Sequence, residues 1–195
     1  MILIRIAEEQ DVLEMLSIYG PYILNTTHTF EYAVPTEGEF LERFRQITRR
    51  HPWLVWEEDG RILGYAYGSA PFERDAYRWT CEASIYLRPE AQGRGIGRRL
   101  YQALEAIMAR QGHRLCYAII TSENTGSLAF HQKMGYSITA EMPGCGRKFG
   151  RWLGVTWMEK KLNPPGDPQD FPLSWAGVRQ DAQRCLDILD ILSLS

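Results

Sequence analysis

A glycine-rich stretch, residues 88–98, constrains what this chain can fold into more than any other segment. Apolar residues 83–87 lead into it, and apolar side chains at helical spacing follow it: Ile96, Leu100, Leu104, Ile107 and Met108. The pattern predicts a strand, a turn and a helix. Gly93, Gly95 and Gly97 allow positive φ and a close approach of the backbone to a ligand. Because the first turn of a helix presents free N–H groups and a positive dipole end, we expect an anion such as a pyrophosphate here.

The glycines alone leave a second interpretation open, a plain turn between a strand and a helix. The stretch lacks the Lys-Ser/Thr pair of a nucleotide-triphosphate P-loop. It is also a poor dinucleotide-binding turn, because its strand lies in mid-chain and no acidic ribose ligand stands out. Arg94, Arg98 and Arg99 add positive charge around the turn.

Composition limits the classes of protein to consider. The chain has 195 residues, of which 45% are apolar, enough for one domain with a real core and an extension. A net charge of −2 implies no general attraction to nucleic acid or to an anionic membrane. The four cysteines form no C-x-x-C pair, so we expect neither a zinc site nor a redox motif, and no other metal. Without a signal-peptide pattern or an apolar run of about 20 residues, we expect a cytoplasmic protein.

Hydrophobic periodicity and turn signals give the order of elements along the chain. Helices are expected over residues 9–25, 36–47, 96–111 and 124–134. Strands are expected over residues 2–6, 53–57, 62–69, 77–87, 115–120, 136–142 and 152–162. Thr36 and Glu39 form a capping box, and Asp59-Gly60 is a hairpin signal. Residues 144–151 are basic and rich in glycine, and we expect a loop there.

A proline-containing linker, residues 163–168, separates this unit from the C-terminal residues. Beyond it, one face of an amphipathic helix is formed by Trp175, Val178, Ala182, Cys185, Leu189 and Leu192. We expect this helix to pack on its own domain or on a partner subunit. The alternative is a frayed tail without function.

The full spelling of the turn, Gln92-Gly93-Arg94-Gly95-Ile96-Gly97, resembles the Q/R-x-x-G-x-G/A signature of the GNAT acyltransferases. Residues 1–162 further resemble one branch of that family, the phosphinothricin and methionine-sulfoximine N-acetyltransferases. The segments that carry this second resemblance are residues 77–87, 128–131, 135–136 and 148–152. The resemblance implies the α/β GNAT fold, a mixed twisted sheet with helices on both faces. The N-acetyltransferase domain then covers residues 1–162, and the extension 163–195 lies outside the resemblance.

The same resemblance implies acetyl-CoA as co-substrate, with its pyrophosphate in the turn and no metal. The implied donor-binding residues are Ile85, Tyr86, Leu87, Gln92, Gly93, Arg94, Gly95, Ile96, Gly97, Arg98, Asn124 and Ser127. Backbone groups of residues 85–87 would pair with the pantetheine arm as if it were an extra strand, and one N–H could face the oxyanion. Asn124 has two interpretations, a helix N-cap and a pantetheine contact, and we expect both.

Glu82 is the candidate general base. It is the only carboxylate in an otherwise uncharged run, residues 79–87, and the family places its catalytic glutamate at this position of the motif. Partial burial would raise its pKa toward neutrality, which suits a base that acts through a water molecule. The alternative is a glutamate that faces solvent from a strand.

His131 is the candidate acid for the departing thiolate, because this branch of the family carries histidine where many relatives have tyrosine. An imidazole can donate that proton, and a thiol with a pKa of about 8.5 needs no strong acid. The alternative is a histidine on a helix surface that is bonded to its neighbours.

The acceptor of this branch is a small amino acid that carries a phosphinate, sulfoximine or sulfone group, for which arginine forks and other cations are suited. The implied substrate-binding residues are Phe30, Arg74, Tyr77, Arg78 and Lys148. Each charge has the alternative of an ordinary solvated side chain. The resemblance also implies a homodimer with acceptor sites near the interface, where Lys148 would act in trans. Residues 81–87 depart from the Val-Glu-His-Ser-Val-Tyr-Val of relatives that take methionine derivatives, so the acceptor itself stays open.

The leading interpretation is therefore an acetyl-CoA-dependent N-acetyltransferase for a small amino-acid analogue, with no nucleic-acid or membrane partner. A second is transfer to another amine, a polyamine or a protein N-terminus. A third is an acyl-CoA-binding regulatory module without catalysis. The cationic candidates at the acceptor end argue against a polyamine, and the joint presence of Glu82, His131 and the turn argues against the regulatory module.

Overall fold

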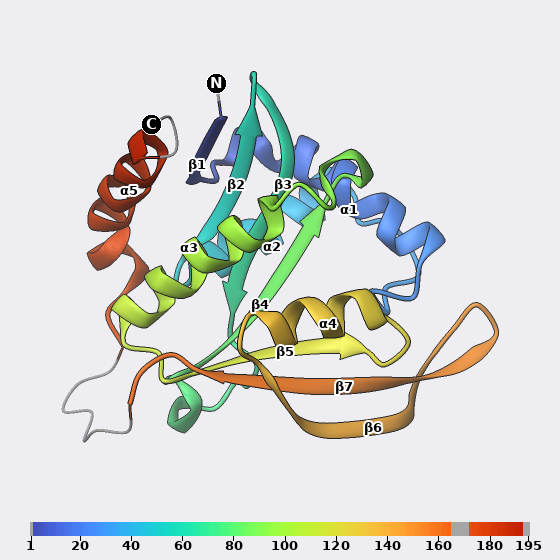
Figure 1. The fold of residues 1–195 in the computed structure, drawn as a ribbon. Coiled ribbons are helices and arrows are strands. Elements are labelled where there is room, and N and C mark those ends of the chain that lie inside the picture. Colours follow the sequence, from blue (N-terminus) through green and yellow to red (C-terminus); the bar gives the residue numbers. More distant parts are fainter. Residues whose placement is uncertain (1, 165–171, 193–195) are drawn as a thin grey trace.

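The computed structural model describes residues 2–164 and 172–192. Its centre is a seven-stranded sheet with the strand order β1-β2-β3-β4-β5-β7-β6 (Figure 1). The strands are β1 (Ile2–Ile6), β2 (Trp53–Glu58), β3 (Arg61–Ser69), β4 (Thr80–Leu87), β5 (Leu115–Thr121), β6 (Ser137–Lys148) and β7 (Arg151–Lys161). Only β4 and β5 are parallel neighbours, and the other adjacent pairs are antiparallel. The mixed sheet of the predicted α/β class is thus present.

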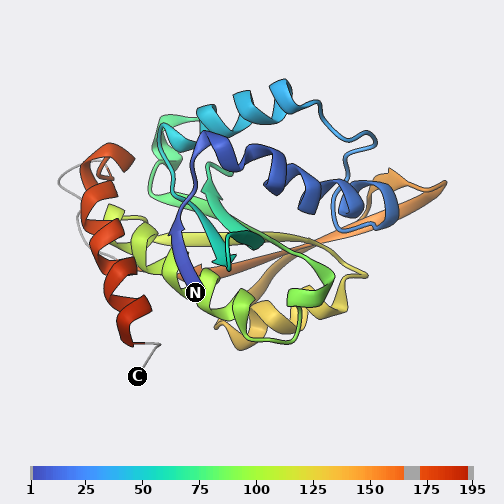
Figure 2. The ribbon, with the colours of Figure 1, turned by 90° about the horizontal axis from the view of Figure 1, so that it is seen from above.

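Helices cover both faces of this sheet. Figure 2 shows α1 (Val12–Asn25) and α2 (Glu37–Thr48) on one face, and α3 (Ile96–Gln111) and α4 (Thr125–Lys133) on the other. Two hydrophobic clusters fill the two interfaces, one under α1 and α2 and the other under α3 and α4. Three short 3-10 helices are η1 (Glu9–Asp11), η2 (Asp75–Tyr77) and η3 (Pro89–Ala91). Alternation along β2 and β3 directs one set of their side chains into each cluster.

The two parallel strands form a fork. They pair only through Thr80 with Leu115, Cys81 with Cys116 and Glu82 with Tyr117, although both strands continue for several residues beyond. Past Glu82 the strands diverge, so their facing backbone edges have no strand partner. Glu82 is the last residue of β4 that pairs with β5, and it lies where the fork begins.

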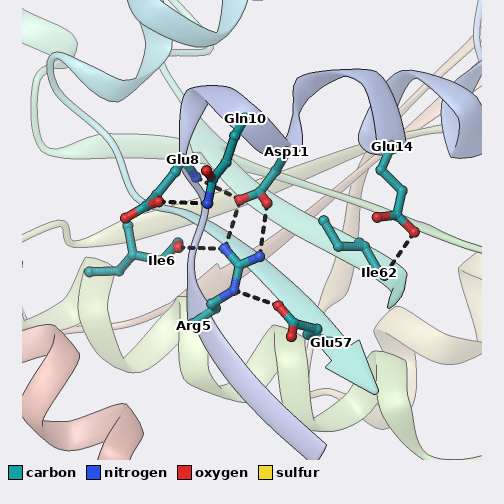
Figure 3. Close-up of polar contacts among 8 residues, drawn as sticks. All are labelled: Arg5, Ile6, Glu8, Gln10, Asp11, Glu14, Glu57 and Ile62. Atoms are coloured by element: carbon teal, nitrogen blue, oxygen red, sulfur yellow. Dashed lines mark hydrogen bonds and ion pairs between the residues drawn. The ribbon is translucent and has the colours of Figure 1, made fainter. Parts of the chain in front are cut away.

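Charged side chains fasten the N-terminal end of the sheet (Figure 3). The Arg5 guanidinium donates two hydrogen bonds to the carboxylate of Asp11, at 2.7 and 2.8 Å, and a third to Glu57 at 2.8 Å. Asp11 is buried, and its partner keeps this charge compensated. The carboxylate of Glu14 accepts from the backbone N–H of Ile62 at 2.9 Å. These contacts fix α1 against β1, β2 and β3.

The C-terminal extension shares the core of the domain. Helix α5 (Trp175–Leu192) lies beside β1 and α3 (Figure 1), and its Trp175, Val178, Ala182 and Leu186 side chains join the cluster under α3. An ion pair of 2.8 Å joins Arg110 to Asp181. The predicted helix thus packs on its own domain. Residues 165–168 of the predicted linker, and the side chains of Cys185, Leu189 and Leu192, lie outside the described part.

Two sequence predictions of secondary structure are wrong. The strand expected over residues 77–87 begins only at Thr80, because residues 75–77 form η2. The expected loop 144–151 is mostly strand, since β6 and β7 form a long hairpin that turns at Phe149 and Gly150. A register shift between Met142 and Gly146 absorbs the glycines within β6.

Candidate active site

A cavity of about 600 Å³ opens at the fork between β4 and β5. Its walls come from residues 83–87 of β4, residues 118–120 of β5, the glycine turn and the first part of α4. The fork gives it a slot shape, because two diverging strands leave their backbone edges bare on either side. An extended ligand with an anionic end fits a slot that ends in a turn of free N–H groups.

The glycine turn has the geometry of an anion cradle. Gly93 and Gly95 have φ of 74° and 81°, which L side chains rarely adopt. Gly95 is the N-cap of α3, and no side chain caps the helix there. The amides of the first turn of α3 are therefore available to a ligand. Gly97 plays a different part, because a Cβ there would lie 3.3 Å from Cδ1 of Leu87, so α3 packs tightly on β4.

The three arginines of the turn have different surroundings. Arg98 lines the cavity. Arg94 instead forms an ion pair of 2.7 Å with Glu58, and Arg99 lies over the ring of Trp56 at 5.0 Å. Ile96 places its side chain in the core and has only its backbone N–H to offer. The structure thus brings Arg98 and the glycines together at the cavity, while the Arg94 side chain is directed to β2.

Tyr22 of α1 contacts the open edge of β4, a residue that sequence reasoning did not select. Its hydroxyl donates to the carbonyl of Leu87 at 2.6 Å, lies 3.4 Å from the Leu87 nitrogen, and accepts from Nε2 of Gln92 at 3.4 Å. Because backbone direction alternates along a strand, Ile85 presents its N–H and C=O to the same edge as Leu87. Tyr22 and Leu87 are 65 residues apart, so no local sequence signal links them.

Glu82 lies at the narrow end of the fork. Its neighbours Cys81 and Ala83 point into the cluster under α3, so alternation directs the Glu82 side chain to the opposite face of the sheet. Its carboxylate accepts no hydrogen bond and forms no ion pair with any residue that the structure describes. Burial raises the pKa of Glu82 to about 7. A carboxylate with that pKa is divided about equally between its two protonation states at neutral pH.

His131 of α4 is enclosed on the other wall of the cavity. Nδ1 lies 2.8 Å from the carbonyl oxygen of Ser127, and Nε2 lies 2.9 Å from the hydroxyl of Tyr101. Because a carbonyl only accepts, Nδ1 carries the proton and the Tyr101 hydroxyl donates to Nε2. Burial lowers the pKa of His131, which keeps the ring neutral near pH 7. Both nitrogens are engaged within the protein.

Asn124 and Ser127, the remaining residues predicted to bind acetyl-CoA, lie at the start of α4. The side-chain oxygen of Asn124 accepts from the backbone N–H of Ser127 at 3.1 Å, so the predicted N-cap is confirmed. Both residues also line the cavity, together with Phe130 and Gly126. His28, which sequence reasoning did not select, lines the cavity from the α1–α2 connection.

That connection is fastened next to the cavity. Thr121 donates to the carbonyl of Thr27 at 2.5 Å, and the hydroxyl of Thr27 donates to Glu123 at 2.7 Å. The Lys148 ammonium donates to the carbonyl of Thr29 at 2.7 Å. Phe30 packs on Gly146, since a Cβ there would meet the ring. Phe30 and Lys148 therefore lie together, with Lys148 buried against this connection rather than free in solvent.

The other predicted acceptor residues lie elsewhere. Arg74, Tyr77 and Arg78 line a second cavity, of about 230 Å³, at the far end of α3. Arg78 is paired with Asp75 at 2.6 Å, and Tyr77 lies against Phe72 with ring centroids 4.5 Å apart. The structure does not bring these three residues to the donor cavity.

In residues 2–164 and 172–192, no group of three or more His, Cys, Asp or Glu side chains is arranged to hold a metal ion. None of the helices in these ranges has the length and apolar character of a membrane span. The cavity offers an anion cradle and an open strand edge, and the carboxylate of raised pKa, that of Glu82, lies outside its lining where the fork begins.

Comparison with known proteins agrees with this geometry. The family described as acetyltransferase (GNAT) domain matches residues 4–157. The L-methionine sulfoximine/L-methionine sulfone acetyltransferase of Salmonella typhimurium is 34% identical over 166 residues, covering 85% of this chain and 97% of the relative. The phosphinothricin N-acetyltransferase of Alcaligenes faecalis is 35% identical over 162 residues, 82% of each chain.

A solved structure extends the likeness to three dimensions. The GNAT superfamily phosphinothricin acetyltransferase from Sinorhizobium meliloti, determined in complex with AcCoA, superimposes with a TM-score of 0.81 at 35% identity. The match covers 86% of this chain and 94% of that chain.

Proposed function

This chain belongs to the GNAT acetyltransferase family, and we propose that its acceptor is a small amino-acid analogue of the phosphinothricin, methionine sulfoximine or methionine sulfone type. It is an acetyl-CoA-dependent N-acetyltransferase, and acetyl-CoA is its co-substrate. The observation that carries the acceptor proposal is the identity of about one third with relatives of those names over nearly their whole length.

The donor fits the fork. The pyrophosphate of acetyl-CoA would accept from the free amides at the head of α3 and from Arg98, and the pantetheine arm would pair with the open edge of β4 at Ile85 and Leu87. An arm held along this edge leads the thioester toward Glu82, where β4 and β5 come together. When the arm is bound, the Tyr22 hydroxyl either gives up one of its hydrogen bonds to Leu87 or forms a hydrogen bond with the arm.

The reaction then needs one base. Glu82, as the carboxylate, takes a proton from the acceptor ammonium, directly or through one water molecule. The free amine attacks the thioester carbonyl, so that the N–C bond forms and the carbonyl π electrons move to oxygen. Collapse re-forms the carbonyl and breaks the C–S bond, and coenzyme A leaves as a thiolate. A backbone N–H of β4 at the fork would stabilise the oxyanion.

The departing thiolate does not need His131 as an acid. A thiol of pKa about 8.5 is a good leaving group near neutral pH, and it can take a proton from solvent or from the protonated amide nitrogen of the intermediate. His131 has a neutral ring with both nitrogens engaged. We therefore propose that His131 is a positioning residue that holds Tyr101 and the start of α4 against the cavity.

The acceptor would enter from the face of the sheet that Glu82 points to. Phe30 and the connection fastened by Lys148 border that side. The β6–β7 hairpin beside them carries large exposed side chains, with Trp152 at 70% exposure and Phe149 at 54%. Isolated hydrophobic residues are ordinary on a surface, but a group of them on one hairpin marks an interface. We propose a homodimer that forms through this hairpin, with the acceptor site next to the hairpin. Arg74 and Arg78 would reach the acceptor site only if their loop moved.

We also propose a cytoplasmic location. The cysteines Cys81 and Cys116 are register neighbours on β4 and β5 and are free thiols. Buried neighbouring thiols that stay unpaired suit a reducing compartment.

The proposal is tested by coenzyme A release over a panel of acceptors. We expect phosphinothricin, methionine sulfoximine or methionine sulfone to give the highest kcat/KM, with spermidine and an N-terminal peptide at background. Activity confined to spermidine or the peptide would remove the acceptor assignment and leave the donor chemistry in place. Absence of activity with every amine, with acetyl-CoA still bound, would instead point to a regulatory module.

A further inference from the structure

The second cavity lies at the end of α3 opposite the glycine turn, and the proposed reaction does not use it. Its volume is about 230 Å³. The end of α2, the connection after β3, the end of α3 and residues 172–174 form its walls. It therefore shares no wall residue with the donor cavity.

Three buried polar side chains with unpartnered atoms line this cavity. His51, Gln111 and His113 are exposed by only 7%, 1% and 3%. Nδ1 of His51 and Oε1 of Gln111 have no hydrogen-bond partner in the described part of the chain. His113 has the backbone of Arg78 as a partner for one ring nitrogen, and its other ring nitrogen has none. The other group of Gln111 is satisfied, since its Nε2 donates to the carbonyls of Arg50 and Leu173. A buried polar atom without a partner is costly, so three around one cavity indicate a missing occupant.

The two imidazoles are adjacent. Their ring centroids are 5.5 Å apart, and their ring planes are inclined by 23°. Burial lowers the pKa of each to about 4, so both rings are neutral near pH 7. A neutral imidazole has one N–H donor and one acceptor nitrogen, so the free nitrogen of each ring can bind a donor or an acceptor of the occupant.

Positive charge surrounds the entrance. Arg49, Arg50 and Arg74 line the cavity, and their guanidinium groups form no ion pair with any residue in the described ranges. Arg78 lines it as well and is paired with Asp75, and Glu73 is the other acidic residue of the wall. Four arginines and two carboxylates line the cavity, which gives it a net positive charge.

We propose that this cavity is a binding site for a small oxyanion, a carboxylate or a phosphate that also carries an O–H or N–H donor. The arginines at the entrance would pair with the anionic oxygens. An imidazole N–H would donate to the same group, and Gln111 would accept the ligand's donor at Oε1. The site is separate from the acceptor proposed above and does not depend on it.

Water is the alternative occupant, because several water molecules fit in the cavity and would satisfy the buried atoms; the titration with anions below distinguishes the two. The negative dipole end of α3 opposes an anion by about 0.3–1 kcal/mol. This opposition is reduced because the carbonyl oxygens of Met108, Ala109 and Gln111 already accept N–H groups of the chain.

The test follows the ring protons of His51 and His113 by NMR while inorganic phosphate, and separately malate, which carries a hydroxyl beside its carboxylates, is added. The protein is first saturated with coenzyme A, so that the glycine turn is already occupied by a pyrophosphate. We expect saturable shifts at both rings with at least one anion. Shifts with malate alone identify a carboxylate ligand, and shifts with phosphate alone identify a phosphate.

Variants then locate the site. In R50Q/R74Q the apparent Kd should rise by roughly tenfold or more, because two charge-assisted contacts are lost. R45Q is the matched control, since Arg45 is an exposed arginine of α2 that pairs with Glu9, and its Kd should stay unchanged. Unchanged coenzyme A binding shows that the double variant is folded. Two results would overturn the proposal. One is that neither anion gives a saturable shift, even at about 50-fold excess over the protein and up to tens of millimolar. The other is that the double variant and the control variant have equal Kd values.

Discussion

The two predicted catalytic residues at the fork are in opposite states. Glu82 lies where the fork begins, outside the lining of the donor cavity, and has a carboxylate of raised pKa that no described residue satisfies. On the α4 wall of the cavity, His131 is fully engaged, with Ser127 at one nitrogen and Tyr101 at the other. The His131 side chain is buried, and that of Glu82 is half-buried.

The difference teaches that free bonding capacity separates a group poised for proton transfer from one that supports structure. An unsatisfied carboxylate with a pKa near neutrality can exchange a proton with a ligand without breaking a protein contact. A neutral imidazole that donates to a carbonyl must first give up that bond. Three substitutions, used in four experiments, test this account.

The largest effect is expected at Glu82. Glu82→Gln removes the base while keeping the size and shape of the side chain. General base catalysis contributes typically 10²–10⁴-fold, so kcat should fall at least ~100-fold at pH 7.5, with the Kd of acetyl-CoA unchanged. Steady-state kinetics and calorimetry measure the two quantities. Glu42→Gln, an exposed carboxylate of α2, is the control, and a fall of less than tenfold in E82Q would remove Glu82 from the mechanism.

A substitution in the glycine turn should weaken the binding of acetyl-CoA and leave the turnover rate nearly unchanged. Gly95→Ala places a Cβ at φ of 81°, and the strain of roughly 1–2 kcal/mol would turn the first amides of α3 away from the pyrophosphate. KM for acetyl-CoA should rise about tenfold while kcat changes little. Gly150→Ala introduces the same kind of strain, at φ of 75°, in the β6–β7 turn, which does not line the cavity. Equal KM values in both variants would contradict the cradle.

Glu82 should also lower the stability of the protein when it is ionised. Its folded-state pKa of about 7 lies above its ordinary value of 4.5, so its favourable contribution is complete below pH 4.5 and is lost as the pH rises through 7. E82Q should therefore be more stable than the wild type by about 2 kcal/mol at pH 8 and equally stable at pH 4. Urea unfolding at the two pH values measures this, and a pH-independent difference would disprove the linkage.

The smallest effect on turnover is expected at His131. His131→Asn keeps a donor for the Ser127 carbonyl but leaves the Tyr101 hydroxyl without its acceptor. Stability should fall by about 1–3 kcal/mol, while kcat falls less than tenfold with an unchanged pH profile. If His131 were the acid, kcat would fall by the ~100-fold or more of general acid catalysis, and the basic limb of the profile would move.

The sequence predicted what local patterns encode. The cradle follows from closely spaced glycines and the periodicity of one helix, and the Thr36 capping box and the Asn124 cap involve residues three apart. The fork, by contrast, depends on where two strands stop pairing, which no single segment records. The Tyr22 contact to Leu87 likewise joins distant segments.

Errors arose where local signals pointed the wrong way. Glycine and basic residues in the stretch 144–151 indicated a loop, but pairing with β7 and a bulge made most of it strand. The family resemblance implied that Arg74 and Arg78 belong to the acceptor site; the β3–β4 connection places them at a cavity separate from the donor cavity, and their role toward the acceptor stays a prediction. Charge indicates what a residue can bind, and only the fold indicates where.

The central claim is that Glu82 is the proton acceptor at the fork. It is tested most directly by the pH dependence of kcat in the wild type and E82Q, measured side by side with acetyl-CoA and acceptor saturating. We expect wild-type kcat to rise with a slope of one and to level off above a pH of about 7, and this limb to be missing in E82Q. The same limb at the same pH in both proteins would contradict the account.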